Sequence, residues 1–122
     1  MFELKVKDKT YEVVYGYRSI AVDNVLDLAK RLGNNANNIE DGSISEFAHG
    51  LEEILLYGLK KENPDFKYST PKEKEEKLEF VRDLLDDYTK EKGNIMAFME
   101  IFTSIMEDLF YEGFSSKTEE ME

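Results

Sequence analysis

The sequence predicts a mostly helical α+β domain in which an N-terminal β-hairpin packs on a bundle of about four helices. Near the N-terminus, apolar and polar residues alternate with the period of two that is typical of half-buried strands. From residue 19 onward, apolar residues recur instead at the spacing of amphipathic helices, between segments rich in Gly, Asn and Pro. A length of 122 residues fits one domain. We expect it to span residues 1–114, with a flexible acidic tail over residues 115–122.

The hairpin is expected over residues 2–15. Apolar residues from Phe2 to Val6 alternate with charged ones, and a second alternating run ends at Tyr15 after a polar turn. Gly16 is expected to let the chain bend sharply away from the sheet. Because an isolated hairpin is marginally stable in water, its apolar face must lie on helices.

The helices are expected at about residues 19–32, 44–61, 71–92 and 95–113. In the first, Val22 belongs to the apolar stripe and Gly33 supplies the stop, before an Asn-rich loop. Gly58 lies in the stripe of the second helix, where it lets a neighbouring helix approach closely. Thr70 is a strong N-cap for the third helix, whose first turns, without apolar residues, should project into water. The very short connection at Gly93 predicts that the third and fourth helices are antiparallel neighbours.

The last helix carries more apolar surface than one neighbour can bury. On a helical wheel its apolar side chains cover an arc of about 220°, whereas packing on one side requires about 100°. The helix therefore either lies in the middle of its own fold or offers a second face to another molecule. In the second case the core side consists of Phe98, Ile101, Ile105 and Leu109. The side left to bind a partner chain then consists of Met96, Met99, Phe102, Met106 and Phe110.

Composition narrows the possible partners. The formal charge is −11, from 27 acidic and 16 basic residues, which argues against nucleic acid as a ligand because phosphate backbones would be repelled. No apolar run is long enough to span a membrane, and the charged N-terminal residues do not resemble an export signal. The chain has no cysteine, which excludes disulfides and thiolate catalysis.

Side chains that could carry chemistry are few. Glu46 and His49 have a Glu-x-x-His spacing, but a carboxylate-bridged di-iron site needs two such motifs, and His49 is the single histidine. Asp83, Asp86 and Asp87 cluster on one side of the third helix, which indicates a solvated face rather than a metal site. We find no nucleophile–base pair and no Gly-rich phosphate loop. We therefore expect a protein that is not an enzyme and uses no metal or cofactor.

Three parts of the chain together resemble a known family in their layout. They are the hairpin from Phe2 to Tyr15, the corner Tyr15-Gly16-Tyr17, and the segment from Met96 to Phe110 with its density of Phe, Ile, Leu and Met. With the helices between them, they make the chain similar to the tail assembly chaperones of siphophages that infect Gram-positive bacteria. The hairpin turn departs from the usual pattern, since Asp8-Lys9 stands where Asn-Gly or Asp-Gly is more common.

The resemblance implies a function without catalysis, in the cytoplasm of a bacterial host. Such chaperones coat the tape measure protein before the tail tube polymerises, keep its apolar helices from aggregating, and are absent from the mature virion. Many are also made in a longer, frameshifted form whose extension recruits the tail tube protein. A soluble complex with the tape measure protein is therefore the first expectation.

Three alternatives stay open at this point. The apolar face of the last helix could instead form a homo-oligomer. An acidic DNA-mimic inhibitor would need carboxylates arrayed over one surface at phosphate-like spacing, whereas the acidic residues here are interleaved with lysines. A small structural head–tail protein would be present in purified virus particles.

Overall fold

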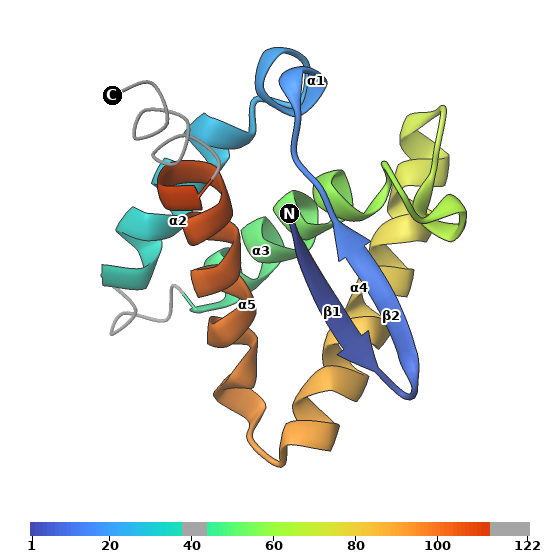
Figure 1. Cartoon of the computed structure of the whole chain (residues 1–122), viewed down its shortest axis with the longest axis vertical. Helices are drawn as coiled ribbons and strands as arrows, with labels where there is room; N and C mark the ends of the chain where they lie inside the picture. Colours follow the sequence, from blue (N-terminus) through green and yellow to red (C-terminus); the bar gives the residue numbers. More distant parts are fainter. Residues whose placement is uncertain (38–43, 113–122) are drawn as a thin grey trace.

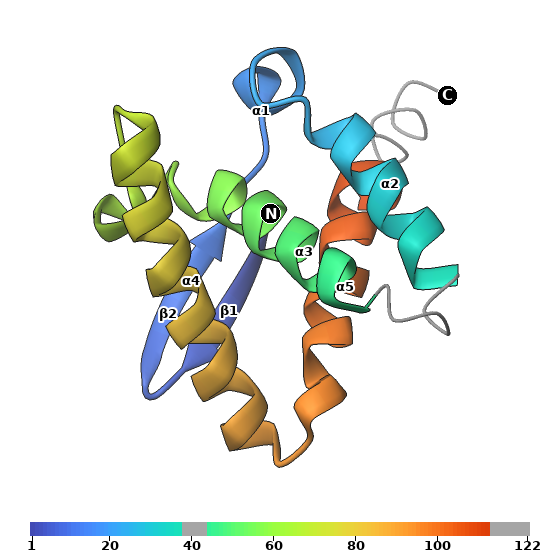
Figure 2. The ribbon, with the colours of Figure 1, turned by 180° about the vertical axis from the view of Figure 1, so that it is seen from behind.

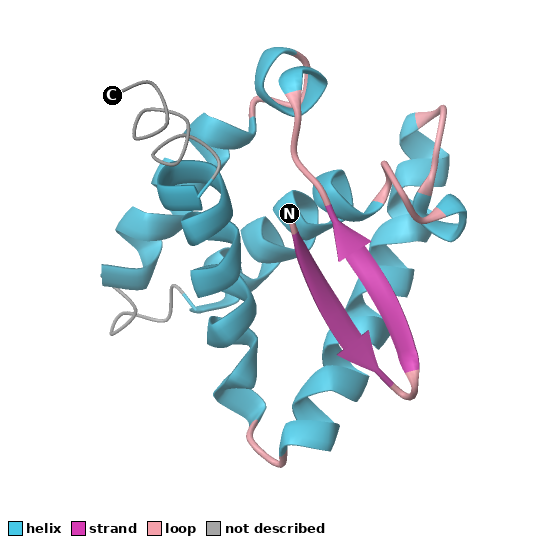
Figure 3. Ribbon diagram, in the orientation of Figure 1, coloured by secondary structure: helices cyan, strands magenta, loops and turns pink. Residues whose placement is uncertain are grey.

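The computed structural model describes residues 1–37 and 44–112. Strands β1 (Phe2–Val6) and β2 (Lys9–Val13) form an antiparallel hairpin (Figure 3). The α-helices that follow are α1 (Tyr17–Ala21), α2 (Val25–Asn37), α3 (Ile44–Leu59), α4 (Pro71–Lys92) and α5 (Phe98–Met106). Shorter helical segments are the 3-10 turns η2 (Pro64–Phe66) and η3 (Ile95–Ala97) and the π-helical segment η4 (Glu107–Glu112). The predicted α+β class, mostly helical with an N-terminal hairpin, is confirmed.

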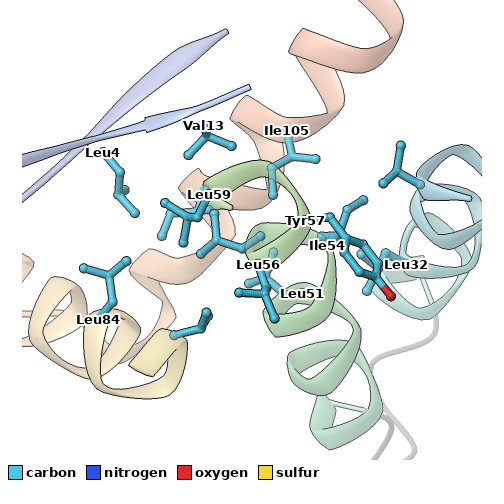
Figure 4. Packing of buried hydrophobic residues seen from close by; sticks show 14 of the residues in the cluster. Leu4, Val13, Leu32, Leu51, Ile54, Leu56, Tyr57, Leu59, Leu84 and Ile105 are labelled. Carbon is cyan, nitrogen blue, oxygen red and sulfur yellow. The ribbon is translucent and has the colours of Figure 1, made fainter. Parts of the chain in front are cut away.

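Helix α3 is the centre of the fold, and the other elements surround it (Figures 1 and 2). From Leu51 to Leu59 almost every side chain is buried. Figure 4 shows apolar side chains from other elements converging on this stretch. They are Leu4 from β1, Val13 from β2, Leu32 from α2, Leu84 from α4 and Ile105 from α5. Since burial of apolar area is the main favourable contribution to folding, this cluster holds the domain together.

The hairpin packs on the helices as expected. Leu4, Val6 and Val13 are buried on its inner face. Its two-residue turn is Lys7-Asp8, one residue earlier than the predicted Asp8-Lys9, because Lys9 already pairs with Val6 in the sheet. Positive φ at Lys7 (51°) and Asp8 (63°) is the geometry of a type I′ turn, although the sequence lacks the usual Asn-Gly. A helix was predicted to approach Gly58 of α3 closely. The element that does so is the end of this hairpin.

The region predicted as one helix over residues 19–32 is two helices. The chain breaks between α1 and α2, where Asn24 takes the left-handed conformation (φ 58°). Val22 lies in this break and is 62% exposed, so it is not part of the core stripe. Gly33 does not end the helix, which continues to Asn37. Packing of the α2 face against α3 outweighs the low helix propensity of Gly and Asn here. The buried residues of that face are Val25, Leu28, Ala29 and Leu32.

The corner between hairpin and α1 does not require a glycine. Gly16 is the N-cap of α1 with an extended backbone (φ −142°, ψ −161°) that any residue adopts, and its N–H donates to Ser19 Oγ at 3.1 Å. The prediction that the flexibility of Gly16 makes the bend is therefore wrong. The side-chain nitrogen of Lys61 lies 2.5 Å from the position that a Cβ at this residue would take.

The later boundaries agree closely with the sequence. Helix α4 begins and ends where predicted, because Thr70 Oγ1 accepts the N–H of Glu73 (3.1 Å) and Gly93 takes a left-handed conformation (φ 69°). Helix α3 ends at Leu59, two residues early. The first turns of α4 do not simply project into water, since Lys74 Nζ donates to Tyr57 Oη on α3 at 2.8 Å. Residues 113–122, with the predicted end of the last helix and the tail, lie outside the described residues.

Helices α4 and α5 are not packed along their lengths. They meet at Gly93 and then diverge like the arms of a V (Figure 1). The prediction of antiparallel neighbours therefore holds only next to the connection. The space between the arms is occupied by side chains of α3, among them Leu51 and Leu56 (Figure 4).

Two tyrosines tie the elements together through their hydroxyls. Tyr15, after β2, donates to the carbonyl of Ile54 on α3 (2.8 Å), and burial raises the pKa of its hydroxyl well above the usual 10.0. Tyr88 on α4 donates to Glu100 Oε1 on α5 (3.0 Å), and burial, together with this bond, raises its pKa to about 12. The folded protein therefore holds both protons more tightly than the unfolded chain does.

We expect the free energy of unfolding to fall as the pH rises above 10. In that range the unfolded chain has released its tyrosine protons while the folded state still binds them, and Tyr15 alone contributes a loss of about 1.4 kcal/mol per pH unit. Tyr15→Phe should cost about 1 kcal/mol at pH 8 and make the alkaline loss smaller. Urea unfolding of both proteins at pH 8 and pH 11 measures this, and an unchanged pH dependence would contradict the assignment.

Candidate functional site

The face of the last helix predicted to bind a partner is unevenly covered. Met96 is 39% exposed and its neighbour Ile95 is 79% exposed. The other predicted contact residues are half-buried and pack against the core: Met99, Phe102, Met106 and Phe110. On the predicted core side, Ile101, Ile105 and Leu109 are buried, which confirms that part of the prediction, whereas Phe98 is only half-buried. Exposed apolar surface is thus concentrated at the start of the helix.

An aromatic cluster fixes α5 on α3. Phe47 of α3 is fully buried, and its ring centroid lies 5.0 Å from that of Phe102 and 6.0 Å from that of Phe98. The Phe47–Phe102 pair has the edge-to-face geometry that aromatic rings prefer. Phe102 therefore supports the fold with part of its ring, which the helical wheel had assigned wholly to the partner side.

A largely apolar groove of about 400 Å³ lies beside this cluster, between α3, α4 and the start of the last helix. Its apolar lining consists of Ala48, Leu51, Leu85, Ile95 and Phe98. Its polar lining consists of Glu52, Arg82, Asp86 and Thr89. Concave apolar surface with a few polar groups at its rim is the usual form of a site that binds a side chain or an apolar helix.

The charges at the rim of the groove are paired. Arg82 Nε donates to Glu52 Oε1 at 2.8 Å, and Arg82 also contacts Glu79 of its own helix. The hydrogen bond to Glu52 raises the pKa of Arg82. Asp86 pairs with Lys90 at 3.0 Å. An apolar ligand could enter this groove without desolvating an unpaired charge.

Sequence reasoning did not find this groove. It placed Phe98 in the core and left Ile95 out of the partner surface. The signal that could have indicated it is the position of Ile95 directly after the N-cap Asn94, whose Oδ1 accepts the N–H of Met96. An apolar residue in the first turn of a helix that diverges from its neighbour has nothing to cover it. Phe80 on α4 is likewise 46% exposed.

The side chains considered for metal binding do not form a site. His49 is paired with Glu52, with Nδ1 3.5 Å from Oε1. Asp83 and Asp87 line a hollow beside the hairpin, whereas Asp86 lines the apolar groove, so these carboxylates do not converge. Within residues 1–37 and 44–112, no group of three or more His, Cys, Asp or Glu side chains could hold a metal ion. In the same part of the chain, every helix is too short or too polar to cross a membrane.

Known proteins give no further guide to the site. No protein-family model matches this chain, and neither the curated proteins nor the solved structures contain a match to it. The function is therefore inferred from the residues described above and from their arrangement.

Proposed function

We propose that this protein is a non-catalytic tail assembly chaperone that binds apolar helices of a phage tape measure protein and keeps them from aggregating. The observation that supports the proposal is the apolar groove flanked by exposed Ile95 and Met96, on a molecule whose formal charge is −11. The resemblance in layout to such chaperones supplies the identity of the client. The site of action would be the cytoplasm of a bacterial host.

Binding would place one apolar ridge of a client helix in the groove. Met and Phe side chains at the groove adapt to different ridges, because Met repacks readily and aromatic rings bury much area. The large negative charge would keep the complexes apart in solution. A frameshifted longer form that recruits the tail tube protein fits the same scheme.

The placement of the carboxylates favours client binding over DNA mimicry. Several pair with basic side chains, as Asp23 does with Lys60 (3.0 Å) and Glu53 with Lys74 (3.3 Å). A DNA mimic would need an array of unpaired carboxylates that replaces phosphates. Salt separates the two functions, because binding to a DNA-binding protein weakens steeply with salt and apolar binding does not.

Co-expression with the tape measure protein of the same genome tests the proposal. We expect a soluble complex that co-purifies and survives high salt. If the tape measure protein stays insoluble and alone, the proposed client is wrong. Detection of the protein in purified virus particles would instead support a structural head–tail role.

The double variant Ile95→Ser, Met96→Ser should lose client binding by at least about tenfold while the domain stays folded, because both side chains are exposed. Pull-down of the tape measure protein and circular dichroism measure the two properties. Phe80→Ser is the matched control, since it removes an exposed apolar side chain from the other side of α4. Equal losses in both variants would mean that the groove is not the client site.

Sedimentation of the same proteins shows whether the groove with Ile95 and Met96 forms a homo-oligomer instead.

A further inference from the structure

The two edges of the hairpin differ in the hydrogen bonds that their outward backbone groups make. In a two-residue type I′ hairpin the closing pair, here Val6 and Lys9, exchanges hydrogen bonds, and the pattern alternates from there. The N–H and C=O groups of Glu3 and Lys5 therefore point outward from β1. Those of Thr10 point outward from β2, on the opposite edge.

The outer edge of β2 is covered only at its far end, whereas among the described residues the outward N–H and C=O of Thr10, next to the turn, have no hydrogen-bond partner. The carbonyl of Glu12 accepts a hydrogen bond from Asn63 Nδ2 (2.7 Å), and the N–H of Val14 donates to the carbonyl of Gly58 (3.0 Å). Within residues 1–37 and 44–112, by contrast, the outward backbone groups of Glu3 and Lys5 have no hydrogen-bond partner. An uncovered edge of this kind is a template for another strand.

A hollow of about 250 Å³ lies along the open edge, between β1 and the ends of α4 and α5. Its lining includes the aromatic ring of Tyr88 and the side chain of Ile101. Its polar lining includes Lys92 and Glu100, whose Nζ and Oε1 are 3.9 Å apart. A side chain on the inner face of an added strand would enter this hollow.

The charges on the outer face of the hairpin indicate what the added strand carries. Glu3 and Glu12 are directly opposite in the register, and both are exposed. Like charges in that position destabilise a hairpin, so a basic residue opposite Glu3 on a neighbouring strand would relieve the repulsion, whereas Lys5, exposed on the same face, would favour an acidic residue opposite it. Inner-face residues of the same strand would be apolar.

We propose that the edge of β1 binds an extended segment of a partner chain as a third strand, with apolar residues on its inner face and, on its outer face, a basic residue opposite Glu3 and an acidic residue opposite Lys5. Glu3 and Lys5 each supply one N–H donor and one C=O acceptor, so four backbone hydrogen bonds form. This surface is separate from the groove at the start of the last helix, and the inference does not depend on the proposed function.

The probe is a short synthetic peptide in which valines alternate with charged residues, and lysine and glutamate take turns at the charged positions. With saturating peptide, amide hydrogen exchange measured by NMR should slow about tenfold at Glu3 and Lys5 and stay unchanged at Thr10 on the other edge. A peptide of the same composition with its lysines grouped at one end should bind more weakly. Unchanged hydrogen exchange at Glu3 and Lys5, or equal binding of both peptides, would overturn the proposal. The experiment uses the unmodified protein.

Proline substitution separates the two edges. Lys5→Pro removes an outward N–H without removing a hydrogen bond of the hairpin, a position where proline is tolerated. It should weaken binding of the alternating peptide at least about tenfold. Thr10→Pro makes the same change on the opposite edge, directly across from Lys5, and should bind as the unmodified protein does. Equal affinity in the two variants would show that the strand does not add at β1.

Discussion

Phe47→Ala is expected to lower the free energy of unfolding by about 3–5 kcal/mol, because it leaves a cavity at a fully buried position. The loss should be at the high end of this range, since Phe47 also contacts the rings of Phe98 and Phe102 and so joins α3 to α5. A typical domain has a stability of about 5–15 kcal/mol, so the variant should be close to unfolding. Urea unfolding monitored by circular dichroism measures the change.

Phe80→Ala is the control for this experiment. The same atoms are removed, but the Phe80 ring is 46% exposed, so the loss should stay below about 1 kcal/mol. Similar losses in the two variants would mean that the α3–α5 contact contributes little to the fold.

Gly58→Ala is expected to destabilise the protein by about 1–3 kcal/mol, against the usual helix-stabilising effect of alanine. The added Cβ would lie 2.5 Å from Val13 Cγ1 and 2.8 Å from the ring of Tyr15. The hairpin cannot easily move away, because the N–H of Val14 donates to the carbonyl of Gly58 and the Tyr15 hydroxyl is bonded to α3. Thermal unfolding gives the size of the effect.

Gly33→Ala is the matched change in another helix. A Cβ at Gly33 would meet no atom within 4 Å, so this variant should gain about 0.5–1 kcal/mol from helix propensity alone. Opposite signs for the two glycines would support the close approach of hairpin and helix at residue 58. A gain in both variants would show that the approach is looser than described.

The sequence predicts those elements whose ends are set by local interactions. The bounds of α4 were correct to the residue, because Thr70 and Gly93 make the cap interactions themselves. The break before α2 was missed, because an apolar residue such as Val22 fits a helical stripe whether or not the chain continues as a helix. Its signal, the Asp23-Asn24 pair in which Asn24 is left-handed, is weak without the structure.

Only the buried side of the last helix could be predicted from the sequence, and the groove beside it could not. A helical wheel separates Ile101 and Ile105 from the rest of the helix, because that pattern is local. The groove depends on how far α4 and α5 diverge and on which side chains of α3 lie between them, and neither is encoded in the spacing of one helix. Leu85 and Ile95 therefore come together at a place that no periodicity indicates.

The central position of α3 also has a consequence for synthesis on the ribosome. The segments that cover this helix lie on both sides of it in the chain, with β2 and α2 made earlier and α4 and α5 made later. Until Ile105 has left the exit tunnel, the apolar stretch from Leu51 to Leu59 has no complete cover. The nascent chain therefore depends on other proteins, or on rapid synthesis, to protect its most apolar helix until α5 has been made.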